Sequence, residues 1–351
     1  MADGAHRGHL AQALRWSPHT PRSGWQAAAA CVGMAAPVAL GLATGHAGEG
    51  FAAAVGAIMI GGVPTERRVI EQARDLGVAL APALAAIFAT LAVHATGPSG
   101  HMLVVPIAAI AALAGSFSRP LAIAAWRFVL FLLICVSIAG SLSHPGALLA
   151  PVAAGLAWTA LANLFFGAIA RAVHPPAANQ QEAPRRHSLR AHWTRWKGTL
   201  RHLAGWQYTI RLTACLAIAA AIVARWPERR LHWVGITVAL LIEREVEALP
   251  VRTTQRAAGT FLGVIVAALA FEWSFPGWAV VAIVAVLAAA RSLLRTRNYL
   301  AYTVVTTPLI VAILDAGAPA GFDLLAERLG ATLLAALLVV AANGLMRRWL
   351  D

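Results

Sequence analysis

The residues of this sequence that could do chemistry are mainly arginines at the ends of apolar runs. The chain has 28 Lys and Arg against 15 Asp and Glu, for a formal net charge of +13. A dense charged group, Glu243–Arg256, separates the apolar run Trp233–Ile242 from a second apolar run. Guanidinium groups bind carboxylates through paired, charge-assisted hydrogen bonds. Arginines held at membrane edges are therefore candidates for contacts with anions.

We expect several arginines at the cytoplasmic ends of the apolar runs to gather the anion, and Arg127 to hold it deeper. Arg127 lies within the apolar run 120–140. A charge at the bilayer centre costs about 2.5–3.5 kcal/mol, so such a residue usually faces a cavity. Snorkelling of Arg127 to the cytoplasmic surface remains the alternative. The arginines expected at the cytoplasmic ends are Arg68, Arg74, Arg119, Arg252, Arg256 and Arg297.

Three further polar residues are candidates for transport. Asn163 and Asn343 occupy matching places in the last apolar run of each half of the chain. They could bind substrate near an axis between the halves, or form interhelical hydrogen bonds that fix packing. Glu243, at a membrane edge, is the expected proton-coupling carboxylate. The alternative is a solvated salt-bridge cluster of Glu243 with nearby arginines, which contributes little.

Motifs for catalysis and metal binding do not occur in the sequence. There is no Walker-type phosphate loop, no His-Glu-x-x-His, no Cys-x-x-Cys and no Gly-x-Ser-x-Gly. The three cysteines, Cys31, Cys135 and Cys215, all lie inside apolar runs. We therefore expect neither an enzyme nor a bound cofactor or metal. The basic excess is better explained by cytoplasmic loops than by nucleic-acid binding.

The elements that must position these residues are membrane helices. Hydrophobic residues make up 59% of the chain and charged residues only 12%, about half the charged share of an average soluble protein. We expect an all-α integral membrane protein with about twelve transmembrane helices. The apolar segments are 24–44, 50–63, 76–94, 102–114, 120–140, 147–171, 206–224, 231–243, 257–273, 276–290, 300–314 and 323–346.

Loop charge predicts the orientation of these helices. The alternate turns at 45–49, 95–101, 141–146 and 315–322 contain no Lys or Arg, whereas the intervening turns are rich in Arg. The turn 225–230 is an exception. By the positive-inside rule both termini lie in the cytoplasm.

The two halves of the sequence repeat each other. Gly24-Trp25-Gln26 recurs as Gly205-Trp206-Gln207, Arg74-x-x-Gly77 as Arg256-x-x-Gly259, and Asn163 as Asn343. Six crossings per half predict two tandem six-helix repeats in the same orientation, related by a parallel pseudo-twofold axis. The expected domains are a cytoplasmic segment 1–23, a first repeat 24–172, a linker 173–204 and a second repeat 205–351.

Two local patterns concern packing and the membrane surface. Gly259 and Gly263 lie one helical turn apart, a spacing that lets two membrane helices approach closely, and Gly77 holds the matching place in the first half. In the linker, Trp193 and Trp196 recur among basic residues, which is typical of an amphipathic helix on the inner leaflet. Such a helix anchors the chain in membrane lipid or senses lipids or a partner.

Two stretches resemble a known family. Trp233-Val234-Gly235-Ile236-Thr237 and Gln255-Arg256-Ala257-Ala258-Gly259-Thr260-Phe261-Leu262-Gly263 are similar to the signature of the fusaric acid resistance (FUSC) family. In the first half, Arg74-Asp75-Leu76-Gly77-Val78 lacks the Thr.

The resemblance implies an efflux transporter of organic acids, often aromatic carboxylates, in the bacterial inner membrane. It implies an organic-anion substrate, possible coupling to protons, and exporters that often work with a periplasmic adaptor. An organic-anion channel and a non-transporting envelope scaffold are the alternatives.

Overall fold

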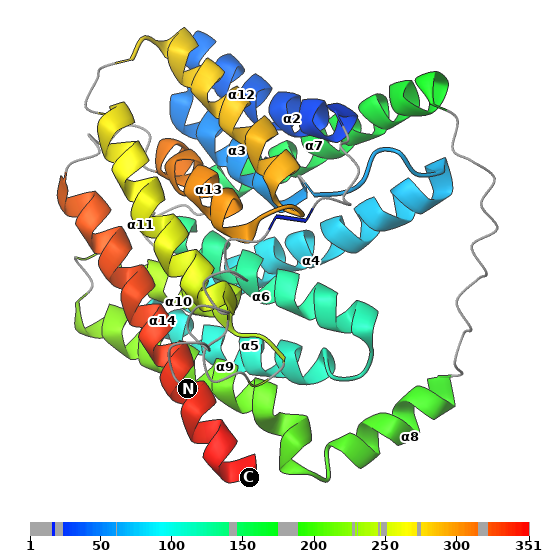
Figure 1. Cartoon of the computed structure of the whole chain (residues 1–351), viewed down its shortest axis with the longest axis vertical. Coiled ribbons are helices and arrows are strands. Elements are labelled where there is room, and N and C mark those ends of the chain that lie inside the picture. Colours follow the sequence, from blue (N-terminus) through cyan, green and yellow to red (C-terminus); the bar gives the residue numbers. More distant parts are fainter. Residues whose placement is uncertain are drawn as a thin grey trace. The chain divides into compact units, whose positions relative to one another are not determined.

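The computed structural model describes the chain except at its first residues and at several turns. All the regular structure among the described residues is helical (Figure 1). The described ranges are 16–17, 24–60, 62–139, 146–174, 189–226, 229, 231–244, 246, 251–271, 275–314 and 322–350.

Each expected apolar segment corresponds to one helix, which confirms an all-α membrane protein. Seven of the described helices are long and apolar enough to cross a bilayer, and four more are apolar but shorter. Six helices precede the linker: α2 (Gly24–Ala43), α3 (Ala47–Ile60), α4 (Val69–Ala95), α5 (Val104–Ala114), α6 (Arg119–Ala139) and α7 (Gly146–Val173). The linker contains α8 (Leu189–Thr199), and the remainder are α9 (Leu203–Arg225), α10 (His232–Leu241), α11 (Val251–Phe271), α12 (Gly277–Leu294), α13 (Tyr299–Leu314) and α14 (Phe322–Leu350).

The turn between α10 and α11 is shorter than the charged segment Glu243–Arg256 that predicted it. We expected Glu243–Arg256 to form a loop, but α11 begins at Val251, so Arg252 and Arg256 lie on a helix. Pro250 directly precedes this start, and proline favours the first turn of a helix. Charge alone misled the assignment because the first turns of a membrane helix can be as polar as a loop.

The chain forms two compact units, each of which combines segments from both halves of the sequence. Unit 1 comprises residues 1–80, 143–174 and 249–333, and unit 2 comprises 81–142, 175–248 and 334–351. The division falls within α4 and within α14. The compact units therefore do not coincide with the expected sequence repeats, which remain a prediction.

Unit 1 is built around the short helix α3, which packs against α2, α7 and α13 (Figure 1). Ten of the 14 residues of α3 are buried, as expected of a helix that is apolar on most sides. Glycines allow its close contact with α7: a Cβ on Gly155 would lie 1.9 Å from the Ala53 carbonyl oxygen, and one on Gly56 would lie 2.2 Å from that of Val152. Around this core, α2 also contacts α12, and α13 contacts α11 and α12.

Unit 2 has a comparable short core helix, α10, in which Trp233 to Ala239 are all buried. It packs against α6 and α9, and α5 packs against the same two helices. The linker helix α8 contacts the α5–α6 turn: Trp196 donates its indole N–H to the Ser116 hydroxyl at 2.7 Å, and its ring lies edge-on to Phe117. The basic linker helix is therefore attached to this unit through aromatic contacts.

Candidate functional site

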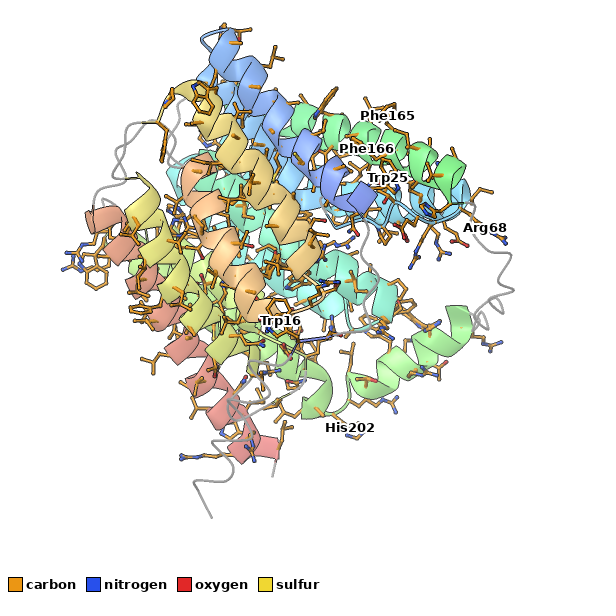
Figure 2. The ribbon with its side chains drawn as sticks, turned by 45° about the horizontal axis from the view of Figure 1, so that its top comes forward. Trp16, Trp25, Arg68, Phe165, Phe166 and His202 are labelled. Carbon is orange, nitrogen blue, oxygen red and sulfur yellow. The ribbon has the colours of Figure 1, made fainter. Side chains whose placement is uncertain are left out.

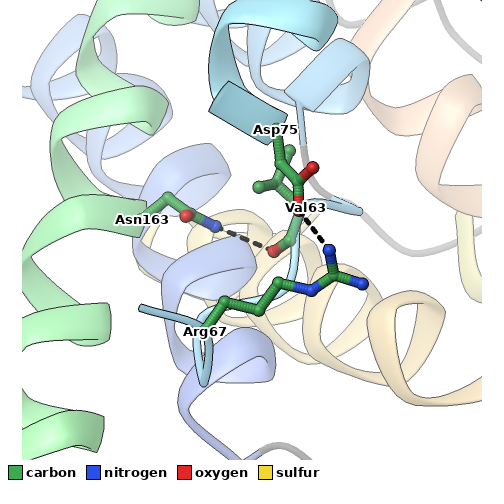
Figure 3. Close-up of polar contacts among 4 residues, drawn as sticks. All are labelled: Val63, Arg67, Asp75 and Asn163. Carbon is green, nitrogen blue, oxygen red and sulfur yellow. Dashed lines mark hydrogen bonds and ion pairs between the residues drawn. The ribbon is translucent and has the colours of Figure 1, made fainter. Parts of the chain in front are cut away.

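The short core helices leave backbone carbonyls that polar side chains must satisfy. In unit 1, the Asn163 amide of α7 donates to the Val63 carbonyl just after α3, at 3.0 Å (Figure 3). Gln72 in turn donates to the Asn163 side-chain oxygen at 2.8 Å and accepts from Arg171 at 2.6 Å. These contacts are the interhelical hydrogen bonds that the sequence left as an alternative for Asn163. A role in substrate binding remains a prediction.

The two expected arginines at the beginning of α4 are exposed to solvent. Arg68, just before α4, is exposed (Figure 2). Arg74, in the second turn of α4, is also exposed. Neighbouring Arg67 forms an ion pair with Asp75 at 3.1 Å, which ties the approach to α4 to its second turn (Figure 3). These residues therefore form a charged surface around the helix start.

Three arginines of unit 1 gather around Tyr302 of α13. Arg256 of α11 is 6% exposed and Arg291 of α12 is 8% exposed. The Arg291 guanidinium lies over the Tyr302 ring, with Cζ 5.6 Å from the ring centroid, and it hydrogen-bonds the phenol. Arg256 and Arg295 are close enough to interact electrostatically with the same phenol. We call Arg256, Arg291, Arg295 and Tyr302 the arginine cluster.

The arginine cluster has donor atoms that the described chain does not satisfy. The Nε atoms of Arg256 and Arg291 are buried, and neither has a hydrogen-bond partner among the described residues. An unsatisfied buried donor costs about 1–3 kcal/mol, and more when it is charged. Such an arrangement is expected where a ligand with acceptor oxygens completes the bonding.

The end of α3 also contributes to the arginine cluster. Arg291 donates to the Ile58 carbonyl at 3.4 Å, a weak bond. The Arg295 guanidinium lies against Gly62, where an added Cβ would be 1.3 Å from its Nη1. Arg295 is exposed, so unlike Arg256 and Arg291 its charge stays in contact with solvent. A side chain at residue 62 would displace the flexible end of Arg295 from this position.

The buried face of α11 continues inward from Arg256. The Thr253 and Thr260 hydroxyls lie on this face, and both are buried without a hydrogen-bond partner among the described residues. One and two turns beyond Thr260 the face becomes small and apolar, and Ala267 packs with Val311 and Leu325. The polar face of α11 therefore ends at an aliphatic seal.

Two glycines on α11 form a close seam with α13. A Cβ on Gly259 would lie 2.7 Å from the Thr303 Cβ, and one on Gly263 would lie 2.6 Å from the Thr307 Cβ. The seam holds α13, and with it Tyr302, close to α11. Gly77 has a different environment: it is exposed, and a Cβ there would meet no atom within 4 Å. The expectation that Gly77 packs like Gly259 is therefore wrong, because no described helix covers that face of α4.

Unit 2 contains a buried arginine of a different kind. Arg211 of α9 is 1% exposed, and its guanidinium donates to the side-chain oxygens of Asn343 and Gln207. It also donates to the Glu243 carbonyl at 2.8 Å, just after α10. Its partners in the described part of the chain are uncharged oxygens. Asn343 thus takes part in an interhelical hydrogen bond, as Asn163 does.

Arg244 continues this polar network. Its carbonyl accepts from Gln207, and its guanidinium lies over the Tyr208 ring, 4.7 Å from the centroid. Burial lowers the pKa of Arg244, and Tyr208 opposes this change. We call Arg211, Gln207, Asn343 and Arg244 the α9 network. Glu243 is partly buried beside it, and its proton-coupling role remains a prediction.

The remaining expected residues are spread over both units. In unit 2, Arg119 is exposed and Arg127 is partly buried. In unit 1, Arg297 is partly buried, and its carbonyl accepts from the Ser17 backbone N–H at 2.9 Å. The Arg252 side chain lies outside the described part of the structure. Of the seven expected arginines, the structure therefore places only Arg256 in the arginine cluster.

Sequence reasoning did not select Arg291, Arg295 and Tyr302. Of the arginines near residue 295, Arg297 is the one expected from the sequence. The signal that could have found the others is their spacing: Arg291 and Arg295 are four residues apart on one face of α12. Tyr302 follows within the first turn of the next helix.

Comparison with known proteins gives one match. Residues 216–342 match the model of a family described as fusaric acid resistance protein-like. This region includes α10 to α13 and so contains the whole arginine cluster. No curated protein and no solved structure matches the chain.

Proposed function

We propose that this chain, a multi-pass membrane protein of the fusaric acid resistance (FUSC) family, exports organic acids across the bacterial inner membrane. Aromatic carboxylates are the proposed substrates. One observation carries the proposal: Arg256 and Arg291 are buried within the family-matched region with unsatisfied guanidinium donors. A carboxylate supplies both the negative charge and the acceptor oxygens that these groups lack.

The polar face of α11 supports a transport role for this site. Thr253, Arg256 and Thr260 occupy one face over about two helical turns, so an anion at Arg256 has hydroxyl donors on both sides along the helix. The aliphatic seal of Ala267, Val311 and Leu325 lies deeper on the same face. A transporter needs a site that is reached from one side while closed to the other. We assign the seal this closing role.

The other expected residues form a second, outer set in this proposal. Exposed arginines attract anions by their summed field, and this attraction weakens with salt. We assign this role to Arg68, Arg74 and Arg119, which are exposed, and to Arg297, which is partly buried; Arg252 is proposed for the same set from its place in the sequence. Arg127, Asn163 and Asn343 are proposed contacts along the pathway, and Glu243 is a proposed proton-coupling site.

The helix order supports the proposed pair of six-helix repeats. Among the described residues, six α-helices precede α8 and six follow it. Three of the six pairs of starts lie about 180 residues apart: Gly24 and Leu203 begin α2 and α9, Val69 and Val251 begin α4 and α11, and Arg119 and Tyr299 begin α6 and α13.

The packing inside each unit gives independent support. In unit 1, α2 packs with α3 and α12, and α13 packs with α3 and α12. In unit 2, α9 packs with α10 and α5, and α6 packs with α10 and α5. If α2, α3, α12 and α13 correspond to α9, α10, α5 and α6, the two sets of helix pairs are the same. We therefore propose that the repeats share a parallel pseudo-twofold relation and exchange helices, so that each unit contains parts of both.

We further propose that both termini are cytoplasmic, following the loop charges. The arginine cluster lies where α3 ends, α11 begins, α12 ends and α13 begins, which this topology assigns to the cytoplasmic side. That placement suits capture of a cytoplasmic acid for export. A periplasmic adaptor is the proposed partner on the other side.

Transport by the full chain in proteoliposomes tests the proposal. We expect flux of labelled hydroxybenzoate, stimulated by a pH gradient, and a fall of about tenfold or more in Arg256→Gln and Arg291→Gln. Arg348→Gln is the matched control, because Arg348 is exposed near the end of α14 and belongs to neither arginine set.

The possible outcomes separate the competing functions. Flux that follows the anion gradient alone, with no effect of pH, would favour an organic-anion channel. A well-folded chain that moves no carboxylate would favour an envelope scaffold. Flux that survives both cluster substitutions would remove the arginine cluster from the pathway.

A further inference from the structure

The arginine cluster has a charge imbalance that the described residues do not resolve. Tyr302 faces Arg256 from α11, and Arg291 and Arg295 from α12. The C-terminal end of α3, near Ile58 and Gly62, approaches the cluster. The acidic residue of α3, Glu49, lies in the first turn at the opposite end of the helix. On α13 itself the only other titratable group beside it is Tyr299, whose ring stacks on Tyr302 at 5.7 Å between centroids.

Among the described residues, no carboxylate forms an ion pair with these three guanidiniums. The ion pair that the described residues do form joins two residues outside the arginine cluster, Arg67 and Asp75. Arg256 and Arg291 are buried, whereas Arg295 is exposed. Removing a charge from water costs several kcal/mol unless an opposite charge accompanies it, so the two buried guanidiniums are the ones that need a counter-charge. A bound organic anion supplies that charge when the site is occupied. When the site is empty, the phenol oxygen of Tyr302 is the described acidic group positioned to supply it.

The position of Tyr302 suits proton exchange. Its phenol hydrogen-bonds Arg291, and its side chain is partly buried and so keeps some contact with solvent. A proton can therefore leave to water or return from it without passing the aliphatic seal of Ala267, Val311 and Leu325.

We propose that Tyr302 is the proton-exchanging group of the anion site, being a phenolate when the site is empty and a phenol when an organic anion is bound. The inference rests on the proposed function, since it needs a bound anion. No covalent bond changes apart from the O–H bond of the phenol. The phenolate takes one proton from solvent as the carboxylate enters, and returns it when the carboxylate leaves.

The exchange keeps the charge of the cluster constant. Three guanidiniums and one phenolate carry the same net charge as three guanidiniums, a neutral phenol and one carboxylate. Without the proton, the entering carboxylate would meet the negative phenolate, and like charges at close range repel. Anion binding and proton uptake are thereby linked, and affinity falls as pH rises through the range where the empty site loses its proton.

Calorimetry on the full chain in lipid nanodiscs tests the linkage, with benzoate as the probe. Titrations at about pH 8 in buffers of different ionisation enthalpy report the protons taken up per benzoate bound. We expect an uptake approaching one proton in the unsubstituted chain and close to none in Tyr302→Phe. Tyr299→Phe is the matched control, because it removes the neighbouring hydroxyl of the stacked pair, and it should keep the uptake.

A spectroscopic readout supports the test if the Tyr302→Phe chain folds poorly. The chain has only three tyrosines, so tyrosinate absorbance is readily assigned. In the unsubstituted chain, benzoate should reduce a tyrosinate band that is present without it. Tyr208→Phe should leave this change intact, since Tyr208 lies in unit 2, where its ring contacts Arg244.

The outcomes distinguish this inference from the proposed function. Proton uptake that persists in Tyr302→Phe, or no tyrosinate change on binding, would overturn the role of Tyr302 and point to a carboxylate such as Glu243, Glu245 or Glu247. Benzoate binding and flux without any proton uptake would overturn proton exchange while leaving transport in place. If the chain neither binds benzoate nor moves any carboxylate, both proposals are overturned.

Discussion

Arg211 in unit 2 and Arg256 in unit 1 are both buried arginines on membrane helices, but their surroundings differ. The Arg211 guanidinium donates to Asn343, Gln207 and the backbone after α10. Arg256 keeps a buried Nε without a partner among the described residues, and two more arginines lie close to the same phenol. The described chain supplies the partners of Arg211, whereas we propose that a bound anion supplies the missing partner of Arg256. The two arginines are therefore separated by whether their hydrogen-bond donors are satisfied within the described chain, and not by how deeply they are buried.

The largest expected effect is the loss of stability on replacing Arg211. Arg211→Met removes the guanidinium that bonds the buried Asn343 and the partly buried Gln207, and we expect a loss of about 3 kcal/mol in the free energy of unfolding. Arg256→Met removes a guanidinium whose Nε has no partner among the described residues, so the substrate-free protein should lose less stability than it does with Arg211→Met. Thermal unfolding in detergent, followed by tryptophan fluorescence, measures both.

The comparison fails if the two substitutions have equal effects on stability. A large loss in Arg256→Met would mean that partners outside the described residues complete its bonding, and Arg256 would then be structural as Arg211 is. Transport sharpens the contrast: at temperatures where both variants stay folded, Arg211→Met should retain more flux than Arg256→Met.

An intermediate effect is expected at the glycine seam that positions the arginine cluster. In Gly259→Ala the new Cβ would lie 2.7 Å from the Thr303 Cβ and 2.9 Å from the Leu300 carbonyl oxygen. Since backbone must shift to relieve these contacts, we expect a loss of about 1–3 kcal/mol, measured as the shift of the thermal unfolding midpoint. Displacement of α13 should also weaken benzoate binding.

Gly77→Ala is the control, as this glycine holds the matching place in the other half. It meets open space, so alanine should be neutral or stabilise the helix by up to about 1 kcal/mol. Equal destabilisation by both substitutions would contradict the assignment of the seam to α11 and α13.

The smallest expected effect belongs to the exposed arginines at the start of α4. The paired substitution of Arg68→Gln and Arg74→Gln should change stability by less than about 0.5 kcal/mol, because neither side chain is buried. Flux at low ionic strength should fall about two- to threefold, since exposed charges raise the local concentration of anions. Repeating the flux assay at high salt checks the cause: screening should remove the difference. An effect as large as that of Arg256→Gln would assign these residues to the binding site itself.

The sequence was sufficient to predict the helices and poor at predicting their polar ends. Each apolar run became a helix because a backbone surrounded by lipid must satisfy its own hydrogen bonds. The assignment failed at Val251–Arg256, where charge suggested a loop but α11 had already begun. Composition cannot separate these cases, because the first helical turns at a membrane edge and a solvated turn have the same residue types.

The candidate site was predictable only in part. Arg256 was expected from its place beside the small residues of α11, and it lies in the arginine cluster. Arg291 and Arg295 were passed over in favour of Arg297, since sequence matching between halves does not indicate which arginine of a group turns inward. Asn163 and Asn343 were equally suited to packing or binding until their hydrogen-bond partners were known.

What the sequence determined by itself is the helical membrane architecture and the family resemblance, because both depend on local composition and on a short contiguous motif. The tertiary structure alone decided which guanidiniums are satisfied and which are not. That outcome depends on contacts between segments far apart in the chain, as when α3 reaches Arg291 of α12. Hydrogen-bond satisfaction is a property of neighbours, and a linear sequence does not state which helices become neighbours.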